Sequence, residues 1–534
     1  MVQKLFLDFS IAPDKGTYLN EEEVSLELRV TARETCNASL ELRYWRGLVE
    51  VSRQIQDWPL QAGSNQREII FGAPANLSEG GYGVEARLSS GGEEARCETA
   101  FDFLCDWAEF PRYGFVCDFT PDRQDAEATI QALARFHLNG LQFYDWQYRH
   151  DDLVPPTDEF IDPLGRPQSL QAVRDLIAAA HRHGMKAMPY LAIYAASAKF
   201  WHAHPEMALY DEKHQLVPFG EEFLGIMDPT AGTGWSTHLL AECRRVLGTL
   251  PFDGLHIDQY GEPQTGFNQE GEPVDLPRAF SDFIQAAVDQ HPRRPVLFNA
   301  VKNWPIDSLT KAPVAFNYIE IWPPKITYWD VAEIVRNARR LSGQKSVVIA
   351  LYIPANRPIN NLLADAVIHA CGGTRIEVGE NGRLLSDPYF PKHEAMSPSL
   401  GEGIRRQTEL LMRYSDWISP QVSENEAVQV TAPAGVFTAY RDAKAGASIS
   451  LVNLQAGVPL SWNEDHAAPE EFKDFEVSLV FSELVESVWL ATADQDSLTA
   501  ASIRFEQIEG RLIIIVPELK IWDVLLIKTS MQVR

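Results

Sequence analysis

The sequence predicts a multidomain α/β protein, with a central (β/α)8 TIM barrel between an N-terminal immunoglobulin-like β-sandwich and a C-terminal antiparallel β-sandwich. Three observations support this fold class. The chain of 534 residues is too long to fold around one ordinary hydrophobic core and long enough to form two or three domains. Short alternating apolar runs, typical of half-buried strands, occupy both ends of the chain. Between them, nearly continuous apolar runs alternate with helical periodicity, as in a parallel sheet.

The first domain is predicted to span residues 1–108. It contains the alternating runs VSLELRV (24–30), SLELRYW (39–45), REIIFG (67–72) and GYGVEARL (81–88), separated by turn-rich pieces. Strands at this spacing, without helical periodicity, favour a small sandwich of immunoglobulin-like type. No group of chemically active residues stands out in it.

The second domain, residues 109–418, repeats the order strand, loop, helix. Eight strands are predicted at 113–120, 139–146, 185–194, 254–257, 295–301, 314–322, 346–353 and 374–379. Helices are predicted at 125–138, 169–184, 234–250, 275–290, 328–343, 360–373 and 401–418. Ser169 is placed as a helix cap, and Gly184 where a helix stop belongs. Eight strands alternating with helices over about 300 residues favour a closed barrel over an open sheet.

The third domain is predicted to span residues 419–534, where the chain returns to alternation. The runs are AVQVTAP, GVFTAYRD, ASISLVNL, FEVSLVFS, SVWLAT, SIRFEQ, RLIIIVP and VLLIKT. We interpret them as a second β-sandwich. A barrel between two sandwiches is common among enzymes that act on polysaccharides, but this analogy between folds establishes no activity.

Composition limits the partners. The net charge of −27 and the pI near 4.9 repel polyanions, so nucleic acid and anionic membranes are not expected as partners, and a neutral substrate is unaffected. The sequence contains no apolar run of about 18 residues, so no membrane-spanning helix is predicted. The first residues do not resemble a signal peptide, so we expect a cytoplasmic chain or a mature secreted form with its signal removed. A monomer is expected.

The six cysteines are scattered, without the spacing of a zinc site, and we expect free buried thiols. A Cys36–Cys97 bridge remains an alternative, because spacing alone does not fix pairing.

In a barrel of this kind the active site lies at the carboxyl ends of the strands. The sequence places carboxylates, amides, a histidine and aromatic side chains there. In strand order they are Asp118; Tyr144, Asp145, Trp146; Tyr190, Tyr194; His256, Asp258, Gln259; Asn299, Lys302; Glu320, Trp322; Tyr352; and Glu377.

Asp258 ends the apolar fourth strand, where a carboxylate is costly to bury unless its charge is used. Taken alone, it is better explained as a cap of the following loop. Glu320, two strands later, is expected to face it across the barrel mouth. Two carboxylates among aromatic and hydrogen-bonding side chains are the equipment of a glycosidase, in which one acid is ionised and the other protonated.

Other chemistries are less well supported. No phosphate loop or dinucleotide fingerprint accompanies these residues, and no cofactor is expected. A metal site made of His256, Asp258 and Glu320 is an alternative, but the paired histidines usual in barrel metal sites are missing from the strand ends. The pair His181 and His183 ends a helix, where cationic groups favour the dipole, and is interpreted as structural.

Three runs in order are similar to known sequences. FYDWQYRHD (143–151), DGLHIDQYGEP (253–263) and YIEIW (318–322) resemble the dextranases of glycoside hydrolase family 66, and the domain order matches as well. The resemblance is strongest over about 110–415. It implies that Asp258 is the nucleophile and Glu320 the acid/base of a retaining reaction on internal α-1,6 links of dextran or isomaltooligosaccharides, without a cofactor.

The same family contains cyclising glucanotransferases, which commonly carry a carbohydrate-binding module inserted in the barrel. The longest loop here, about 195–232, is too short for one, which favours hydrolysis without excluding transfer. The lack of a visible secretion signal departs from an extracellular role. A catalytically inactive carbohydrate-binding protein and an α-galactosidase-like barrel are the remaining alternatives.

The other strand-end residues are expected to bind sugar. Asp145 and Trp146 are predicted to hold the first subsite; the structural alternative is rim packing, with Asp145 paired to Arg149. Further sugar contacts or barrel closure are predicted for His256, Gln259, Asn299, Tyr190, Tyr194 and Trp322. Asp118 and Glu377 are expected either to bind hydroxyls or to form ion pairs, for example with Arg375. Glu377 and Glu262 are the alternatives to Glu320 as the acid/base.

Overall fold

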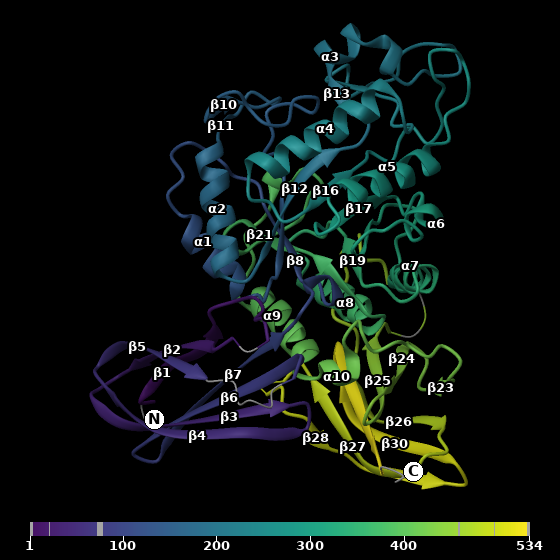
Figure 1. The fold of residues 1–534 in the computed structure, drawn as a ribbon. Coiled ribbons are helices and arrows are strands. Elements are labelled where there is room, and N and C mark those ends of the chain that lie inside the picture. Colours follow the sequence, from purple (N-terminus) through teal and green to yellow (C-terminus); the bar gives the residue numbers. More distant parts are fainter. Residues whose placement is uncertain are drawn as a thin grey trace.

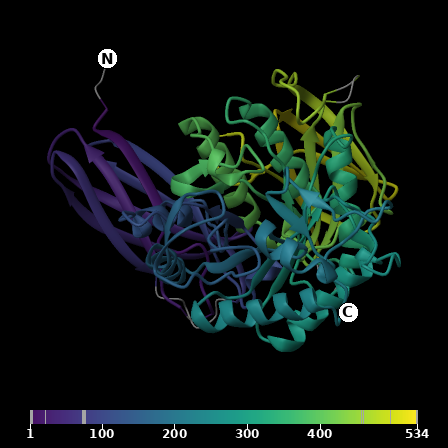
Figure 2. The same ribbon diagram turned by 90° about the horizontal axis from the view of Figure 1, so that it is seen from above.

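The computed structural model describes residues 4–20, 22–71, 78–455, 457, 460–495 and 497–530. Figure 1 shows antiparallel strands near the N-terminus, a helix-wrapped sheet rich in parallel strands in the middle, and antiparallel strands near the C-terminus. Seen from above, the two sets of antiparallel strands lie on opposite sides of the molecule (Figure 2). The protein is therefore a multidomain α/β protein, as predicted at this level.

The N-terminal strands form two antiparallel sheets with one apolar cluster. In sheet order they are β1 (Phe6–Pro13), β2 (Val24–Ala32) and β5 (Gly63–Phe71), and then β4 (Val49–Leu60), β3 (Cys36–Arg46), β6 (Gly80–Ser90) and β7 (Glu93–Phe103). Four of these, β2, β3, β5 and β6, match predicted runs; Gly72, at the end of one run, lies outside the described residues. Strands β1, β4 and β7 were not predicted.

None of the six cysteines is in a disulfide bond. Cys36 and Cys97 are half-buried and unbonded, so the alternative of a bridge between them is not realised. The expectation that all the thiols are buried was wrong for Cys105, which is exposed.

The central sheet has ten strands. In sheet order they are β20 (Gly373–Ile376), β19 (Val347–Ala350), β18 (Asn317–Glu320), β17 (Val296–Val301), β16 (Leu255–Asp258), β12 (Lys186–Ala192), β9 (Gly140–Phe143), β8 (Tyr113–Val116), β21 (Val378–Gly379) and β22 (Arg383–Leu384). Every pairing is parallel except that between β21 and β22. Nine of these strands correspond to the eight predicted ones, because the last predicted strand is split into β20 and β21.

Strand β8, the first of this sheet in chain order, lies next to the segment that follows β20. Strand β20 pairs with β19, and β21, which starts two residues later, pairs with β8 through Gly379 and Phe115. A side chain would not fit at this seam: a Cβ on Gly114 would lie 2.5 Å from the Val378 carbonyl oxygen, and one on Gly379 would lie 2.3 Å from that of Phe115. Two glycines therefore permit the close approach.

Helices cover the outside of the sheet (Figure 1). They are α1 (Ala126–Ala134), α2 (Leu170–Arg182), α4 (Gly234–Thr249), α5 (Leu276–Gln290), the short α6 (Ile306–Leu309), α7 (Tyr328–Leu341), α8 (Pro358–Ala370) and α9 (Pro398–Arg413). As predicted, Ser169 caps α2 and Gly184 ends it with a positive φ of 72°. His181 and His183 contact Asp253 and Glu127, which agrees with a structural role.

The segment predicted as the longest loop is folded. Residues 195–226 contain β13 (Ala195–Ser197), α3 (Ala198–Ala203), β14 (Pro218–Phe219) and β15 (Leu224–Ile226), and the strands form a small antiparallel sheet in the order β13, β15, β14. We call residues 195–226 the cap. A hairpin of β10 (Glu159–Ile161) and β11 (Pro167–Ser169) also leaves the central sheet. Strands this short carry too few alternating residues to be recognised in the sequence.

The C-terminal strands again form two antiparallel sheets around an apolar cluster. One contains β23 (Val430–Thr431), β26 (Phe472–Val480), β30 (Arg511–Leu519) and β29 (Phe505–Ile508). The other contains β24 (Val436–Ala443), β25 (Gly446–Asn453), β31 (Trp522–Thr529), β27 (Val485–Thr492) and β28 (Ala501–Ser502). Each predicted run overlaps at least one of these strands, and SIRFEQ overlaps both β28 and β29. The short helix α10 (Ser415–Ile418) connects them to α9.

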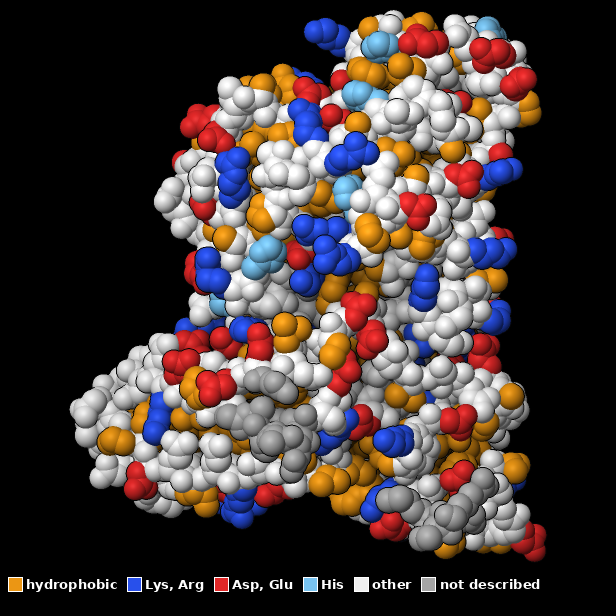
Figure 3. Space-filling model, viewed as in Figure 1, with side chains coloured by type: hydrophobic (Ala, Val, Ile, Leu, Met, Phe, Trp, Pro, Cys, Tyr) orange, Lys and Arg blue, Asp and Glu red, His pale blue; other side chains and the backbone are white. Residues whose placement is uncertain are grey.

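Surface charge is mixed on the face shown in Figure 3, where acidic and basic side chains are interspersed. Within the described ranges, every helix is too short or too polar to cross a lipid bilayer.

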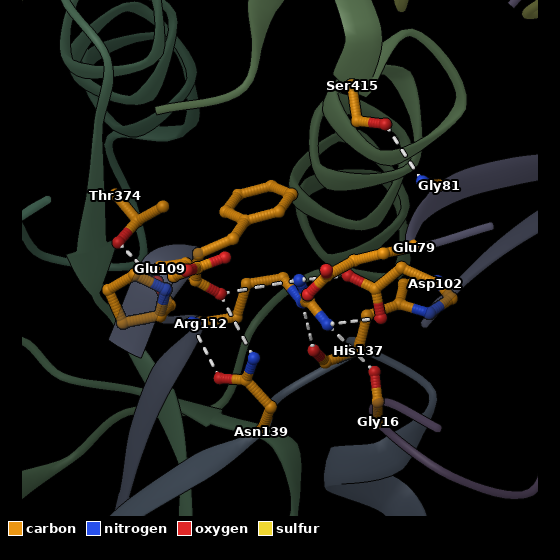
Figure 4. A network of polar contacts seen from close by, with 12 residues as sticks. Gly16, Glu79, Gly81, Asp102, Glu109, Arg112, His137, Asn139, Thr374 and Ser415 are labelled. Carbon is orange, nitrogen blue, oxygen red and sulfur yellow. Dashed lines mark hydrogen bonds and ion pairs between the residues drawn. The ribbon is translucent and has the colours of Figure 1, made fainter. Parts of the chain in front are cut away.

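A buried arginine joins the N-terminal strands to the central sheet (Figure 4). Arg112 lies just before β8 and is 3% exposed, and its guanidinium donates to both carboxylate oxygens of Asp102 at 2.7 and 3.0 Å. It also donates to the backbone carbonyls of Gly16 and His137. One side chain therefore satisfies polar groups from three segments that are distant in sequence.

We predict that Arg112→Met lowers the free energy of unfolding by roughly 3–5 kcal/mol, because it leaves the Asp102 carboxylate buried without its partner. Urea-induced unfolding followed by tryptophan fluorescence measures the change. Arg96→Met is the matched control, since the Arg96 side chain is 71% exposed and lies 3.4 Å from Glu94; its effect is expected within about 0.5 kcal/mol. Equal effects of the two substitutions would contradict the interpretation.

Candidate active site

Three neighbouring parallel strands bring two carboxyl groups and one amide together. Asp258 ends β16, Glu320 ends β18, and Asn299 lies on β17 between them. The Asn299 Nδ2 donates to Asp258 Oδ1 at 2.8 Å and to Glu320 Oε2 at 2.7 Å. The distance between the two accepting oxygens therefore cannot exceed the sum of these two hydrogen-bond lengths.

The surroundings of the pair raise the proton affinity of both acids. Burial and the nearby Glu320 charge together raise the pKa of Asp258 to about 7, although the hydrogen bond from Asn299 lowers it. Burial also raises the pKa of Glu320, against hydrogen bonds from Asn299, Trp322 and Tyr352. The Trp322 Nε1 donates to Glu320 Oε1 at 2.7 Å. Each carboxyl group therefore binds its proton more tightly than it would in water, and the two titrate as an interacting pair.

Both carboxyl groups face a cavity of about 780 Å³ at the carboxyl ends of the strands. Its floor is made of strand-end side chains, and its walls come from separate loops. The cap contributes Phe219, Phe223 and Leu224, and the hairpin between β10 and β11 contributes Leu164. The aromatic rings of Tyr389 and Phe390 close another side. A cavity lined by aromatic faces and a few polar groups is suited to a sugar chain.

Asp145 lies in this cavity and is held by an arginine. The Arg166 Nη2 donates to Asp145 Oδ2 at 3.1 Å, and the same guanidinium contacts Asp162 and the Tyr389 hydroxyl. Burial raises the pKa of Asp145 to about 6, and the Arg166 charge opposes the rise. The expected alternative partner, Arg149, instead lies over the Tyr148 ring.

The structure brings seven of the predicted site residues to the cavity. They are Asp145, Tyr190, Asp258, Gln259, Asn299, Glu320 and Trp322. Gln259 is 1% exposed. Its Nε2 donates to the carbonyls of residues 299 and 304, and its Oε1 accepts from the N–H of residue 261. Much of its hydrogen-bonding capacity is therefore used inside the protein.

Five predicted residues do not line the cavity. Trp146 is fully buried; it donates from Nε1 to the Tyr190 carbonyl and packs against Phe252 on the helix side of the sheet. The reason is local: Asp145 has a positive φ of 57°, which turns the chain immediately before Trp146.

His256 and Tyr194 are also internal. His256 lies one layer below Asp258, between the rings of Tyr113 and Tyr318, and burial lowers its pKa to about 3. It is therefore neutral. The Tyr194 hydroxyl donates to the Glu262 carbonyl and accepts from the Tyr260 N–H, so it supports the loop after β16.

Glu377 and Asp118 complete this group. Glu377 is buried behind the sheet, where its Oε2 lies 2.8 Å from Arg375 Nη2, so the predicted ion-pair alternative is the one observed. Asp118 is exposed, and its carboxylate accepts from the Thr120 N–H. Glu262, an alternative to Glu320, is exposed and lies 3.2 Å from Lys302 Nζ.

Sequence reasoning missed the residues that the loops bring to the cavity. Arg166, Tyr389, Phe390, Phe219 and Phe223 come from the hairpin, from the segment after β22 and from the cap. The turn sequence DPLGR and the aromatic cluster DPYFPK were visible signals, but neither lies at a predicted strand end. Tyr144 and Tyr352, which end strands in the predicted order, also line the cavity.

A second cavity, of about 1110 Å³, lies between the N-terminal strands and α9. Its lining consists mainly of arginine and carboxylate side chains that pair with one another, such as Arg405 with Glu402 and Arg135 with Glu27. Among the residues that the structure describes, no three histidine, cysteine or carboxylate side chains are grouped in a way that could hold a metal ion.

The fold and the site together define a class. Buried paired carboxyl groups at the carboxyl ends of parallel strands, in an aromatic cavity, are the arrangement of glycoside hydrolases. The family model described as glycosyl hydrolase family 66 matches residues 13–526. The chain belongs to that family.

Individual relatives agree with this assignment. A cycloisomaltooligosaccharide glucanotransferase of Niallia circulans is 32% identical over 346 residues, which cover 60% of this chain and 36% of the relative. A dextranase of Streptococcus salivarius is 22% identical over 531 residues, which cover 79% of this chain and 64% of the relative. The chain thus spans about a third of the first of these and under two thirds of the second.

Solved structures show the same fold. A Paenibacillus sp. cycloisomaltooligosaccharide glucanotransferase, solved with cycloisomaltoheptaose, superposes with a TM-score of 0.88 at 20% identity, covering 97% of this chain and all of that chain. A maltogenic α-amylase of Thermotoga neapolitana has a TM-score of 0.51 at 12% identity, covering 79% of this chain and 99% of that chain.

The raised pKa of Asp258 leads to a stability prediction. The folded protein holds the proton more tightly than the unfolded chain, so the contribution of Asp258 to stability is complete below its ordinary pKa of 3.8 and is lost as the pH rises through about 7. Asp258→Asn does not titrate. We therefore predict that this variant gains thermal stability relative to the wild type at pH 8 and gains less at pH 4.

Differential scanning calorimetry at the two pH values measures this difference. Asp122→Asn serves as the control, because Asp122 is exposed, and its effect is expected to be the same at both pH values. If the melting temperature of Asp258→Asn differs from that of the wild type by the same amount at pH 4 and at pH 8, the pKa of Asp258 is not raised.

Proposed function

We propose that this protein cleaves internal α-1,6-glucosidic links of dextran or isomaltooligosaccharides by a retaining double displacement, with Asp258 as nucleophile and Glu320 as acid/base. The observation that carries the proposal is the single Asn299 nitrogen that bonds both carboxyl groups. It keeps the two accepting oxygens close together, which supports a carboxyl separation like the about 5–5.5 Å of retaining enzymes rather than the about 6.5–9.5 Å with which inverting enzymes admit a water molecule.

The chemistry proceeds in two steps. Asp258 attacks the anomeric carbon while Glu320 donates its proton to the departing 6-oxygen, which gives a glycosyl-enzyme ester and a shortened chain. Glu320, now ionised, takes a proton from water, and the resulting hydroxide displaces Asp258 from the anomeric carbon. Asn299 donates to Asp258 Oδ1, and the Tyr190 side chain and the Gln259 backbone also hydrogen-bond the carboxylate, which hold it in place for the attack.

Cleavage needs a protonated Glu320 and an ionised Asp258. In the substrate-free site, burial raises the pKa of both acids, while the hydrogen bond from Asn299 lowers both and those from Trp322 and Tyr352 lower that of Glu320. A leaving oxygen beside Glu320 accepts a hydrogen bond only from the protonated acid, and positive charge at the anomeric carbon favours ionised Asp258. Substrate therefore stabilises the reactive distribution.

The substrate class rests on the family and on the shape of the cavity. The relatives named above are a dextranase and glucanotransferases that form cycloisomaltooligosaccharides. Asp145, Tyr190 and Trp322 are proposed to bind the sugar beside the cleaved bond, and the aromatic walls are proposed to bind the sugars that follow. No cofactor takes part in either step.

Transfer to a hydroxyl group of the same chain is the second candidate, because the first relatives in the comparison are named glucanotransferases. It requires the same covalent intermediate and differs only in the acceptor. The cap is small and adds no separate module between strands β12 and β16. This supports water as the acceptor.

We also propose the finer architecture in which this chemistry takes place. Residues 109–418 would form a closed (β/α)8 barrel, residues 1–108 an immunoglobulin-like sandwich and residues 419–534 a second sandwich. Supporting observations are the pairing of β21 with β8 and one interior cluster of side chains from β8, β12, β17, β18, β19 and β20.

We predict that Asp258→Asn and Glu320→Gln both lose at least about 1000-fold in kcat on dextran, measured as reducing ends, with the fold retained by circular dichroism. A non-catalytic carbohydrate-binding protein would release no reducing ends even as the wild type. Separation of the products by mass distinguishes linear from cyclic oligosaccharides, and linear products are expected to dominate.

Azide then separates the two roles. Glu320→Gln, supplied with an isomaltosyl substrate that has a good leaving group, still forms the ester, and azide is expected to restore turnover and yield the α-glycosyl azide. Asp258→Gly is expected to give the β-azide instead. The opposite pairing of variants and azide anomers would mean that the two roles are reversed.

A further inference from the structure

A loop of the active site is held by a residue from the C-terminal strands. The loop is residues 322–327, between β18 and α7, and it begins with Trp322. Residues 323–325 are exposed, and the loop's own turn is closed by a bond from the Lys325 N–H to the Trp322 carbonyl. An exposed loop with so few internal contacts needs outside support to hold one conformation.

That support comes from residues 460–462, in the connection between β25 and β26. The indole Nε1 of Trp462 donates to the Lys325 carbonyl at 2.9 Å, and its backbone N–H donates to the Ile326 carbonyl at 2.9 Å. Ser461 forms an isolated bridge with Thr327. Trp462 is only 4% exposed, so it is packed between the two parts of the protein.

The supporting segment is itself fixed to the central sheet's helices. The fully buried Asn360, on α8, donates to the carbonyls of residues 461, 462 and 464, and Arg357 donates to that of Asn463. Strand β25 packs against α8, in agreement with the arrangement of the C-terminal strands below α7 and α8 in Figure 1. Residues 460–464 are therefore a fixed platform.

The other end of the loop reaches Glu320. Trp322 lines the cavity, and its Nε1 donates to Glu320 Oε1 at 2.7 Å, while Asn299 occupies Oε2. Movement of the loop would shift this indole, and a shift of a few tenths of an ångström weakens a bond of this length.

We propose that Trp462 is a positioning residue for the active site: it fixes the loop that carries Trp322, and Trp322 in turn fixes the Glu320 carboxyl group. The C-terminal strands thereby contribute to the acid/base step without touching substrate. The inference rests on the proposed role of Glu320.

The pH profile reports this coupling. The titratable groups that face Glu320 are Asp258 and the hydroxyls of Tyr144, Tyr318 and Tyr352. Of these only Asp258 titrates near neutral pH, and its contacts are the same in both variants. The Trp322 hydrogen bond lowers the pKa of Glu320. Weakening it raises that pKa, so the basic limb of the kcat/KM profile moves to higher pH.

The experiment is a double-mutant cycle on dextran with Trp322→Phe, Trp462→Phe and the double variant. We expect Trp462→Phe to lower kcat about 3- to 10-fold, with KM changed less than about twofold, and to move the basic limb upward. We expect Trp322→Phe to move it at least as far, and Trp462→Phe to add nothing in that background. Trp329→Phe, an exposed tryptophan on α7, is the matched control and should leave the profile unchanged.

Each other outcome counts against a defined step. The role of Trp462 is overturned if folded Trp462→Phe leaves the basic limb of the kcat/KM profile unmoved. It is also overturned if Trp462→Phe moves that limb further in the Trp322→Phe background. An unmoved limb in Trp322→Phe itself contradicts Glu320 as the acid/base and thus the proposed function. If Trp462→Phe does not fold, Arg357→Met replaces it, since it releases the platform at Asn463 without altering either tryptophan, and the same outcomes apply.

Discussion

One amide nitrogen bridging two buried carboxyl groups is the constraint on which the site depends. Two acids at this separation cannot both stay ionised away from water at low cost, and each raises the proton affinity of the other. Asn299 offsets part of that cost by donating to both, and it keeps the two accepting oxygens close together. The strand order β16, β17, β18 is what places an amide between two acids.

The other parts of the protein serve this arrangement at increasing distance. Hydrogen bonds from Trp322 and Tyr352 lower the pKa of Glu320, which burial raises. The loop containing Trp322 is held by Trp462, in the connection between β25 and β26. On the opposite side, Arg112 ties the start of β8 to the N-terminal strands. Residues from both ends of the chain thus contact the central sheet, and one of these contacts is made to the loop that begins with Trp322.

The sequence was most informative where periodicity and position act together. Eight strands, most of the helices and the pairing of Asp258 with Glu320 follow from apolar patterning and from the rule that strand ends meet at one face. That rule does not reveal which way a side chain points once the strand has ended. Trp146 follows a residue with positive φ, and its side chain turns toward the helices. His256 points to the same side of β16 as Asp258, but it lies two residues earlier and contacts Tyr113 below the cavity.

The parts that could not be predicted come from tertiary structure. Arg166, Phe219 and Tyr389 reach the cavity from a hairpin, the cap and a late loop, and no local pattern indicates where such segments fold back. Glu377 ends a strand as expected, yet the break between β20 and β21 turns it away from the cavity toward Arg375. Irregular geometry of this kind depends on packing between distant segments and leaves little trace in single-residue preferences.

The proposed reaction depends on a covalent intermediate on Asp258, with Glu320 close beside it. Proton NMR of the first products released from an isomaltooligosaccharide distinguishes retention from inversion, because the two give different anomers before mutarotation mixes them. Retention releases the α-anomer first, and the β-anomer then appears only by mutarotation. Initial release of the β-anomer would contradict the proposed reaction, since inversion requires a water molecule between carboxyl groups that Asn299 holds too close together.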